Sequence, residues 1–136
     1  MINLNINTGS NTPIYKQITD QVRLAVAAGK LVVDDQLPSI RALAERLVIN
    51  PNTVARAYAD LAREGLIESR AGRGVFVTRK RRMFTREEGW RRLEPLMDVV
   101  IGEAMVLDFT PPELREAFEK KLSQWKPRKG GSRNDE

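Results

Sequence analysis

The 136-residue chain is 41% hydrophobic and 30% charged, with a net charge of +5, which is typical of a globular protein. It contains no cysteine and no histidine, so disulfides and the usual zinc sites are excluded and the commonest general base is missing. We therefore expect a protein that is not an enzyme and that uses neither a metal nor another cofactor.

The excess positive charge is confined to the first part of the chain. Residues 1–82 carry 13 basic against 7 acidic residues, whereas residues 83–136 carry 10 against 11. This distribution predicts that a polyanion binds the first part only. No apolar run approaches the roughly 18 residues of a membrane span, and residues 1–10 lack the basic and apolar parts of a signal peptide. We expect a cytoplasmic protein without membrane contact.

The chain begins with an arm and a first helix. Residues 1–11 loosely alternate apolar and polar side chains, which favours a short arm or an edge strand. Thr12 as N-cap and Pro13 at the first position predict a helix that stops at Gly29. Its apolar stripe consists of Ile14, Ile18, Val22, Ala25 and Val26.

Two more helices follow a connector over residues 31–37. Ser39 is the expected N-cap of the second helix, and Asn50 followed by Pro51 begins the third. A turn at residues 48–49 joins them, so the pair predicts a helix-turn-helix. Their buried faces are expected to be Ile40, Leu43, Ala44 and Leu47, and Val54, Ala57, Tyr58 and Leu61.

A glycine turn over residues 71–74 separates two short apolar runs, residues 66–69 and 75–77. Strand, turn and strand predict a β-hairpin, which is a wing when it follows a helix-turn-helix. The expected fold class is mainly α with a small β-hairpin. We predict a winged helix-turn-helix DNA-binding domain over residues 1–78.

The second part is expected to be helical and to follow a basic linker, residues 79–84. A capping box at Thr85 predicts a long amphipathic helix, in which Pro95 should cause a kink or a local break. Thr110 begins a last helix. Residues 126–136 contain no large apolar residue and are predicted to form a disordered tail.

These last two helices, within residues 85–125, carry more apolar surface than two helices can hide against each other. A two-fold homodimer through them is therefore expected. The predicted dimerisation residues are Trp90, Leu93, Met97, Val100, Ile101, Ala104, Leu114, Phe118 and Leu122.

The start of the third helix carries side chains suited to reading bases. In a helix-turn-helix, the first residues of the second helix of the motif enter the major groove. Asn50 and Asn52 can pair with adenine, and Thr53 can donate to either base of a pair. The alternative is that Asn50 acts only as an N-cap and Asn52 is only solvated.

Further candidates flank this helix. Ser39 is expected to cap and to touch a phosphate, and Arg41 should face outward beside it. Gly72 and Arg73 at the wing tip suit the adjacent minor groove. The alternatives are a solvated Arg41 and a plain tight turn. A phosphate patch at residues 79–82 is less specific, because basic runs are often only solvated.

Arg56 lies off the apolar stripe of the third helix. Two interpretations remain open for it. Its side chain can reach DNA, or it can pair with Asp60 at the i+4 position.

The segments LPSIRALAERL (37–47), NPNTVARAYADLAREGLIESR (50–70) and AGRGVFV (71–77) resemble the DNA-binding domain of the GntR family of bacterial regulators. The phrase NPNTVARAY and the short C-terminal part are similar to the YtrA subfamily. That resemblance implies two dimerisation helices and no large effector domain. It also implies DNA contacts at Arg41, Asn50, Asn52, Thr53, Gly72 and Arg73.

Two departures from the family pattern bear on recognition. Many members have arginines that read bases in the places of Pro51 and Ala55, so base reading is expected to shift to the two asparagines and Arg56. In addition, residues 34–35 are both aspartate where a glycine turn is usual.

The expected function is a sequence-specific transcriptional regulator, a repressor that binds double-stranded DNA as a homodimer on a two-fold symmetric operator. The resemblance further implies control of a transport operon and release by a small-molecule effector, although no ligand-binding signature is evident. A protein-binding winged helix is the main alternative, and the charge distribution and the arginine-bearing wing argue against it. A carboxylate-based hydrolase is disfavoured because no pair of acids forms an evident site.

Overall fold

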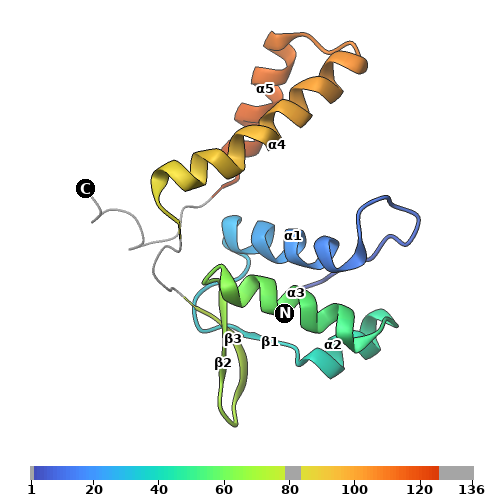
Figure 1. Cartoon of the computed structure of the whole chain (residues 1–136), viewed down its shortest axis with the longest axis vertical. Coiled ribbons are helices and arrows are strands. Elements are labelled where there is room, and N and C mark those ends of the chain that lie inside the picture. Colours follow the sequence, from blue (N-terminus) through green and yellow to red (C-terminus); the bar gives the residue numbers. More distant parts are fainter. Residues whose placement is uncertain (1, 79–83, 126–136) are drawn as a thin grey trace. The chain divides into compact units, whose positions relative to one another are not determined.

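The computed structural model describes residues 2–78 and 84–125, which contain five helices and three short strands (Figure 1). The chain separates into two compact units, divided between residues 82 and 83. That division falls within the predicted basic linker, of which all but residue 84 lies outside the described residues, as does the predicted disordered tail. None of the described helices is long and apolar enough to cross a membrane.

Helix α1 (Ile14–Ala27) buries all of the predicted apolar stripe except Ile14, which is half-buried, and Ile18 and Val22 are almost fully covered. The predicted N-cap is wrong by one residue. Pro13 takes the N-cap position, with φ −56° and ψ 149°, and its carbonyl accepts the first helical hydrogen bonds. Thr12 instead ends the preceding loop, where its backbone N–H donates to Ser10 Oγ at 3.0 Å.

The first residues form an arm along α1 and not an edge strand. Leu4 is buried, and Ile2 and Ile6 pack against the same core. Gln21 holds both backbone groups of Asn5, with its Oε1 accepting at 3.0 Å and its Nε2 donating at 2.6 Å. Gln17 does the same for Asn7, at 2.8 and 3.0 Å. Two side-chain amides thus take the place of a pairing strand.

The helix-turn-helix consists of α2 (Ile40–Leu47) and α3 (Pro51–Arg63). Both predicted N-caps are confirmed. Ser39 Oγ accepts from the backbone N–H of Ala42 at 3.0 Å, and Asn50 Oδ1 accepts from that of Asn52 at 2.8 Å. The predicted apolar residues of α3 are all buried, and in α2 Leu43 and Ala44 are buried while Ile40 and Leu47 are half-buried.

Tyr58 links α3 to the segment ahead of α2. Its hydroxyl donates to the carbonyl of Pro38, just ahead of α2, at 2.7 Å. Burial raises the pKa of Tyr58 to about 12, and the nearby charge of Arg46 opposes that shift. The neutral hydroxyl therefore stays available as a donor. Val48 ends α2 in the left-handed conformation, with φ +56°.

The wing is part of a three-stranded antiparallel sheet in the order β1-β3-β2. β2 (Ile67–Arg70) and β3 (Gly74–Val77) form the predicted hairpin. β1 (Gln36–Leu37) lies in the segment that was predicted to be a connector, and it pairs with β3. A strand of two residues shows no alternation in the sequence, which explains why it was not predicted.

The second unit is a helical hairpin of α4 (Arg86–Val106), yellow to orange in Figure 1, and α5 (Pro111–Leu122), orange to red. The capping box at Thr85 is confirmed, and a second one forms at Thr110. A break at Pro95 is not observed, because the helix continues through it. A proline removes one backbone hydrogen bond, and the flanking turns of this 21-residue helix hold it together.

Candidate nucleic-acid interface

The first turn of α3 presents the side chains predicted to read bases. Asn50 and Asn52 are both exposed, and Thr53 is half-buried. The two asparagines differ in what they can offer. Asn50 Oδ1 is engaged as a cap, whereas the Asn52 side chain has no such role in the helix. A bidentate pair with adenine needs both the amide oxygen and the amide nitrogen, so Asn52 is the better suited of the two.

Pro51 and Ala55 lie on the accessible side of the same turn, with Pro51 exposed and Ala55 half-buried. Neither side chain has a hydrogen-bonding atom. The two positions at which the resemblance implies arginine therefore carry apolar side chains in this turn. Apolar side chains can contact a thymine methyl but cannot donate a hydrogen bond to guanine.

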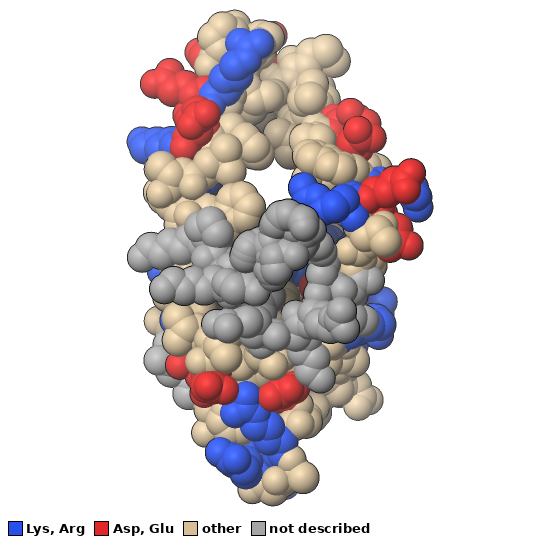
Figure 2. Space-filling view, turned by 90° about the vertical axis from the view of Figure 1, so that its left-hand side faces the viewer, with Lys and Arg blue, Asp and Glu red and all other residues tan. Residues whose placement is uncertain are grey.

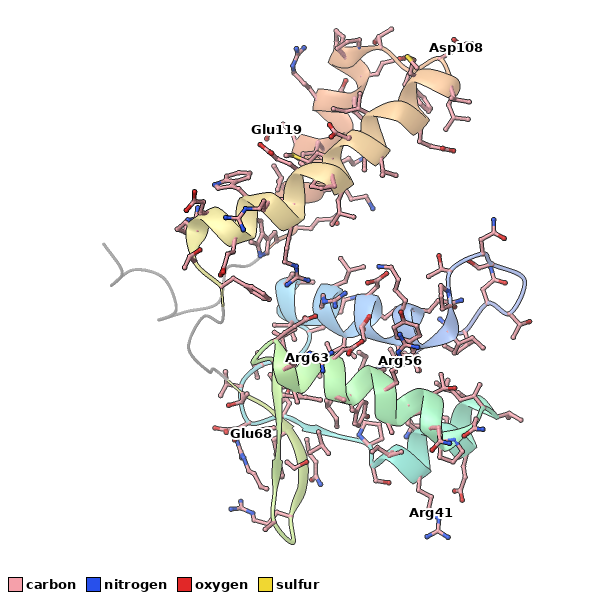
Figure 3. All side chains as sticks on the ribbon, viewed as in Figure 1. Arg41, Arg56, Arg63, Glu68, Asp108 and Glu119 are labelled. Carbon is pink, nitrogen blue, oxygen red and sulfur yellow. The ribbon has the colours of Figure 1, made fainter. Side chains whose placement is uncertain are left out.

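Arg41 extends from α2 into solvent. Its side chain is 87% exposed and makes only a long contact to Glu45, 4.0 Å between Nε and Oε2. In Figure 3 it points to the side of the unit toward which the wing also extends. An exposed arginine with so weak an internal partner is free to bind a phosphate or a base edge.

Two glycines shape the wing tip. Gly72 has φ +71° and open space around it, and Gly74 has φ +118°. Between them, Arg73 is exposed and its backbone N–H donates to the carbonyl of Arg70 at 2.8 Å. The predicted pair of Gly72 and Arg73 thus lies at the outermost part of the hairpin. Positive φ at both glycines explains why the turn is made of glycine.

Arg70 stands beside Arg73 but is engaged inside the wing. Its guanidinium donates to Asp34 and to Glu68, each at 2.8 Å, and these bonds raise the pKa of Arg70. It also lies over the Phe76 ring, 4.4 Å from the centroid. Asp34 has φ +77°, so the aspartate takes the backbone conformation that favours glycine. Its departure from the family pattern therefore adds an acidic partner for the wing.

In the structure, Arg56 makes an interaction that differs from both of the alternatives expected from the sequence. Its guanidinium stacks on the Tyr15 ring of α1, 3.8 Å from the centroid. Among the described residues Asp60 pairs with Arg63, and no ion pair joins Arg56 to Asp60. Figure 3 places Arg56 between α1 and α3, whereas Arg41 points away from both helices. A DNA contact by Arg56 stays a prediction, and the stack favours a structural role.

The basic residues of the first unit fall into two groups. Those of α1 and of the far end of α3 have carboxylate partners: Lys16 pairs with Asp20, Arg23 with Asp20 and Glu64, and Arg63 with Asp60. In Figure 2, Lys and Arg also gather at the lower end, where the wing lies. Arg41 of α2 is only weakly paired, and the ion pairs found among residues 2–78 do not include Arg73 of the wing.

Sequence reasoning missed two residues of this surface, Gln36 and Arg70. Gln36 lies on β1 and donates from Nε2 to the carbonyl of Arg73 at 3.0 Å. Both side chains act across the sheet on partners distant in sequence. The only available signal was the two-residue strand, which is too short to be recognised.

The second unit carries an apolar groove of about 900 Å³ between α4 and α5. Six of the predicted dimerisation residues line it: Leu93, Met97, Val100, Ile101, Leu114 and Phe118. Trp90 and Leu122 are exposed outside it, and Ala104 is already buried within the single chain. Leu96, Met105 and Phe109 also line the groove and were not predicted.

An exposed reading helix and a basic wing on a compact helical core define the class of winged helix-turn-helix DNA-binding proteins. Residues 14–77 match the family described as bacterial regulatory proteins, gntR family. The chain is 34% identical over 132 residues to the HTH-type transcriptional repressor YtrA of Bacillus subtilis strain 168, covering 97% of this chain and 99% of that one. It belongs to the GntR family and is a YtrA-like, DNA-binding transcription regulator.

Two solved structures resemble the chain over most of its length. A transcriptional antiterminator from Listeria monocytogenes EGD-e has a TM-score of 0.77 and 26% identity, covering 96% of this chain and 98% of that one. YtrA from Sulfolobus acidocaldarius, a GntR-family transcription factor, has a TM-score of 0.56 and 38% identity, covering 76% and 97%. The predicted family and fold class are thus confirmed.

Proposed function

We propose that the chain is a repressor that reads a specific operator through the start of α3, α2 and the wing. The observation that carries this proposal is the shared accessibility of these three parts. Arg41 is 87% exposed, the Asn52 side chain is exposed, and Arg73 stands at the wing tip. Asn52 and Thr53 are assigned to the major groove, with Asn50 and Ser39 near phosphates. Gly72 and Arg73 are assigned to the minor groove.

Selection of bound duplexes from a random DNA pool, followed by affinity measurements, tests this assignment. We expect Asn52→Ala to relax the preference at one base pair of each half-site, with a cost of about 1–3 kcal/mol on the selected sequence. Arg41→Ala should weaken binding by a similar amount. Arg63→Ala is the matched control, because it removes a charge that Asp60 already neutralises at the other end of α3. Equal loss of affinity for all sequences in Asn52→Ala would contradict base reading.

The operator is proposed to be two-fold symmetric because the second unit is suited to form a homodimer. Leu96, Ile101 and Phe118 are each more than half exposed in the single chain. Apolar surface of this extent on a small unit is characteristic of an interface. A dimer through α4 and α5 would place two reading helices on half-sites one or more helical turns apart.

Sedimentation equilibrium of the full chain checks the dimer. We expect a dimer at micromolar concentration and a monomer for Phe118→Lys, which introduces a charge into the groove. Val99→Lys is the control, because Val99 is 68% exposed and does not line the groove. A monomeric parent protein would contradict the proposed homodimer, and therefore also the proposed two-fold symmetric operator.

The proposal also covers regulation. We propose that the chain represses a transport operon and is released by a small-molecule signal, as the resemblance to the YtrA subfamily implies, and that it acts in the cytoplasm on a chromosomal target. Deleting the gene and measuring transcripts of neighbouring genes tests both repression and target. Raised transcripts of a transporter operon are expected, and lowered transcripts would identify an activator.

A further inference from the structure

One side chain anchors the wing tip to β1. Gln36 pairs with Phe76 through the backbone of the sheet, and its Nε2 donates to the main-chain carbonyl of Arg73 at 3.0 Å. Gln36 and Arg73 are 37 positions apart. The bond therefore ties the turn of the hairpin to a strand outside the hairpin.

Gly74 makes room for this contact. Its φ of +118° is one that side-chain-bearing residues rarely adopt. A Cβ atom placed at position 74 would lie 2.6 Å from Nε2 of Gln36, which is too close for two non-bonded atoms. Any larger residue at position 74 would push the amide away from Arg73. Glycine at 74 and glutamine at 36 are thus sterically matched.

Both main-chain polar groups of Arg73 are held as a result. Its N–H donates to the carbonyl of Arg70 at 2.8 Å, and its C=O accepts from Gln36. The side chain of Arg73 extends from this fixed backbone, with its guanidinium carbon 5.9 Å from the centroid of the Phe76 ring. A fixed backbone restricts the directions in which the guanidinium can point, which lowers the free-energy cost of ordering it on DNA.

Charge pairing separates the roles of the two wing arginines. Arg70 is neutralised by Asp34 and Glu68. Within residues 2–78, no carboxylate forms an ion pair with Arg73. Arg70 therefore links the turn end of β2 to Asp34 and Glu68, and Arg73 carries the charge that remains for a ligand.

We propose that Gln36 is a positioning residue for DNA binding, which presents the Arg73 guanidinium to the minor groove by holding the Arg73 carbonyl. This inference rests on the proposed wing contact. Gln36 itself does not need to touch DNA. Its effect should depend entirely on Arg73, and that dependence separates a positioning residue from a direct contact.

A double-mutant cycle in the full chain tests the dependence, with affinity for the most enriched selected duplex measured over a range of salt. We expect Gln36→Ala to weaken binding about three- to tenfold and Arg73→Ala about tenfold or more. The double variant should bind no more weakly than Arg73→Ala alone. The slope of log affinity against log salt should fall by about one in Arg73→Ala, and by less in Gln36→Ala.

Two further variants sharpen the result. Gln36→Glu keeps the size of the side chain but lacks the donor, so it should bind at least as weakly as Gln36→Ala. Gln21→Ala is the matched control, because it removes an exposed glutamine whose amide holds backbone groups of Asn5 on the arm. It should keep the parent affinity, and thermal unfolding of every variant shows whether the fold is intact.

The possible results distinguish a failure of the role of Gln36 from a failure of the DNA contact by Arg73. Additive losses in the double variant would show that Gln36 acts independently of Arg73, which overturns the inference. A loss in Arg73→Ala with none in Gln36→Ala overturns the inference alone. If Arg73→Ala binds DNA as tightly as the parent, Arg73 does not contact DNA. The proposed role of Gln36 then fails as well.

Discussion

The guanidinium of Arg23 binds the carboxylate of Glu64 through two hydrogen bonds, Nε to Oε1 at 2.9 Å and Nη2 to Oε2 at 2.6 Å. Arg23 lies on α1 and Glu64 is the C-cap of α3, so this pair joins the first helix to the end of the reading helix. The Glu64 side chain is only 19% exposed, which sets this ion pair apart from most of the others. A two-pronged geometry with one shielded partner is the arrangement in which an ion pair contributes most.

The Arg23–Glu64 ion pair should stabilise the fold measurably. A double-mutant cycle with Arg23→Ala and Glu64→Ala should give a coupling of about 1 kcal/mol, because Arg23 is itself 36% exposed and partly screened. Denaturant unfolding is the measurement. The same cycle on Arg63 and Asp60 should give less than about 0.5 kcal/mol, since the Arg63 side chain is 68% exposed. Equal coupling energies for the two ion pairs would show that the low solvent exposure of Glu64 does not strengthen its pair with Arg23.

Val48 offers a stabilising substitution. It is a β-branched residue at φ +56°, and it is 87% exposed, so its side chain gains little from packing. Relief of the left-handed strain in Val48→Gly should exceed the added entropy of the unfolded chain and raise the free energy of unfolding by about 0.5–1 kcal/mol. Ala28→Gly is the control: Ala28 caps α1 at φ −83°, and glycine there should destabilise. A less stable Val48→Gly protein would show that the strain is not real.

Tyr58 should make stability depend on pH in the alkaline range. Its pKa is about 12 in the folded chain against an ordinary value of 10.0, so the stabilising effect of the neutral hydroxyl is complete below pH 10. That contribution is lost as pH rises from 10 through 12, by up to about 2–3 kcal/mol. The measurement is urea unfolding of the parent and Tyr58→Phe across this window.

The Tyr58→Phe protein starts lower, by about 1 kcal/mol, because the carbonyl of Pro38 loses its donor. Its stability should then fall less steeply than that of the parent between pH 10 and 12. The two proteins differ only in this hydroxyl, so the difference between the two curves isolates Tyr58. Parallel curves would argue against a buried neutral hydroxyl.

Substituting Arg56 should mainly lower the stability of the fold, whereas substituting Arg41 should mainly lower the affinity for DNA. Arg56→Ala removes the stack on Tyr15 and should cost about 0.5–1 kcal/mol of stability, with a smaller effect on DNA binding than Arg41→Ala. Arg41→Ala should leave the melting temperature unchanged and weaken binding, because the side chain is exposed and almost unpaired. The reverse pattern would assign the DNA contact to Arg56.

The parts of the fold that depend on local interactions could be predicted from the sequence. The caps at Ser39, Asn50 and Thr85 each bind a backbone group two or three residues away, so their residue types alone indicate them. The buried stripe of α3 follows from its periodicity in the same way. The family resemblance rests on these same local patterns.

Contacts between distant residues could not be predicted. The bond from Gln36 to Arg73 and the stack of Arg56 on Tyr15 each join elements whose approach is set by packing. The groove shows the same limit. Its predicted residues followed the stripe of an ideal helix, whereas Phe109 enters from the turn between α4 and α5.

The uneven pairing of charge in the first unit has a kinetic consequence. On α1 and the far end of α3 the positive side chains have carboxylates beside them, whereas Arg41 and Arg73 are left nearly unscreened by protein. An arginine with no carboxylate beside it presents its full charge to a polyanion at short range. The association rate, and not only the lifetime of the complex, would therefore depend on where the acidic residues are placed.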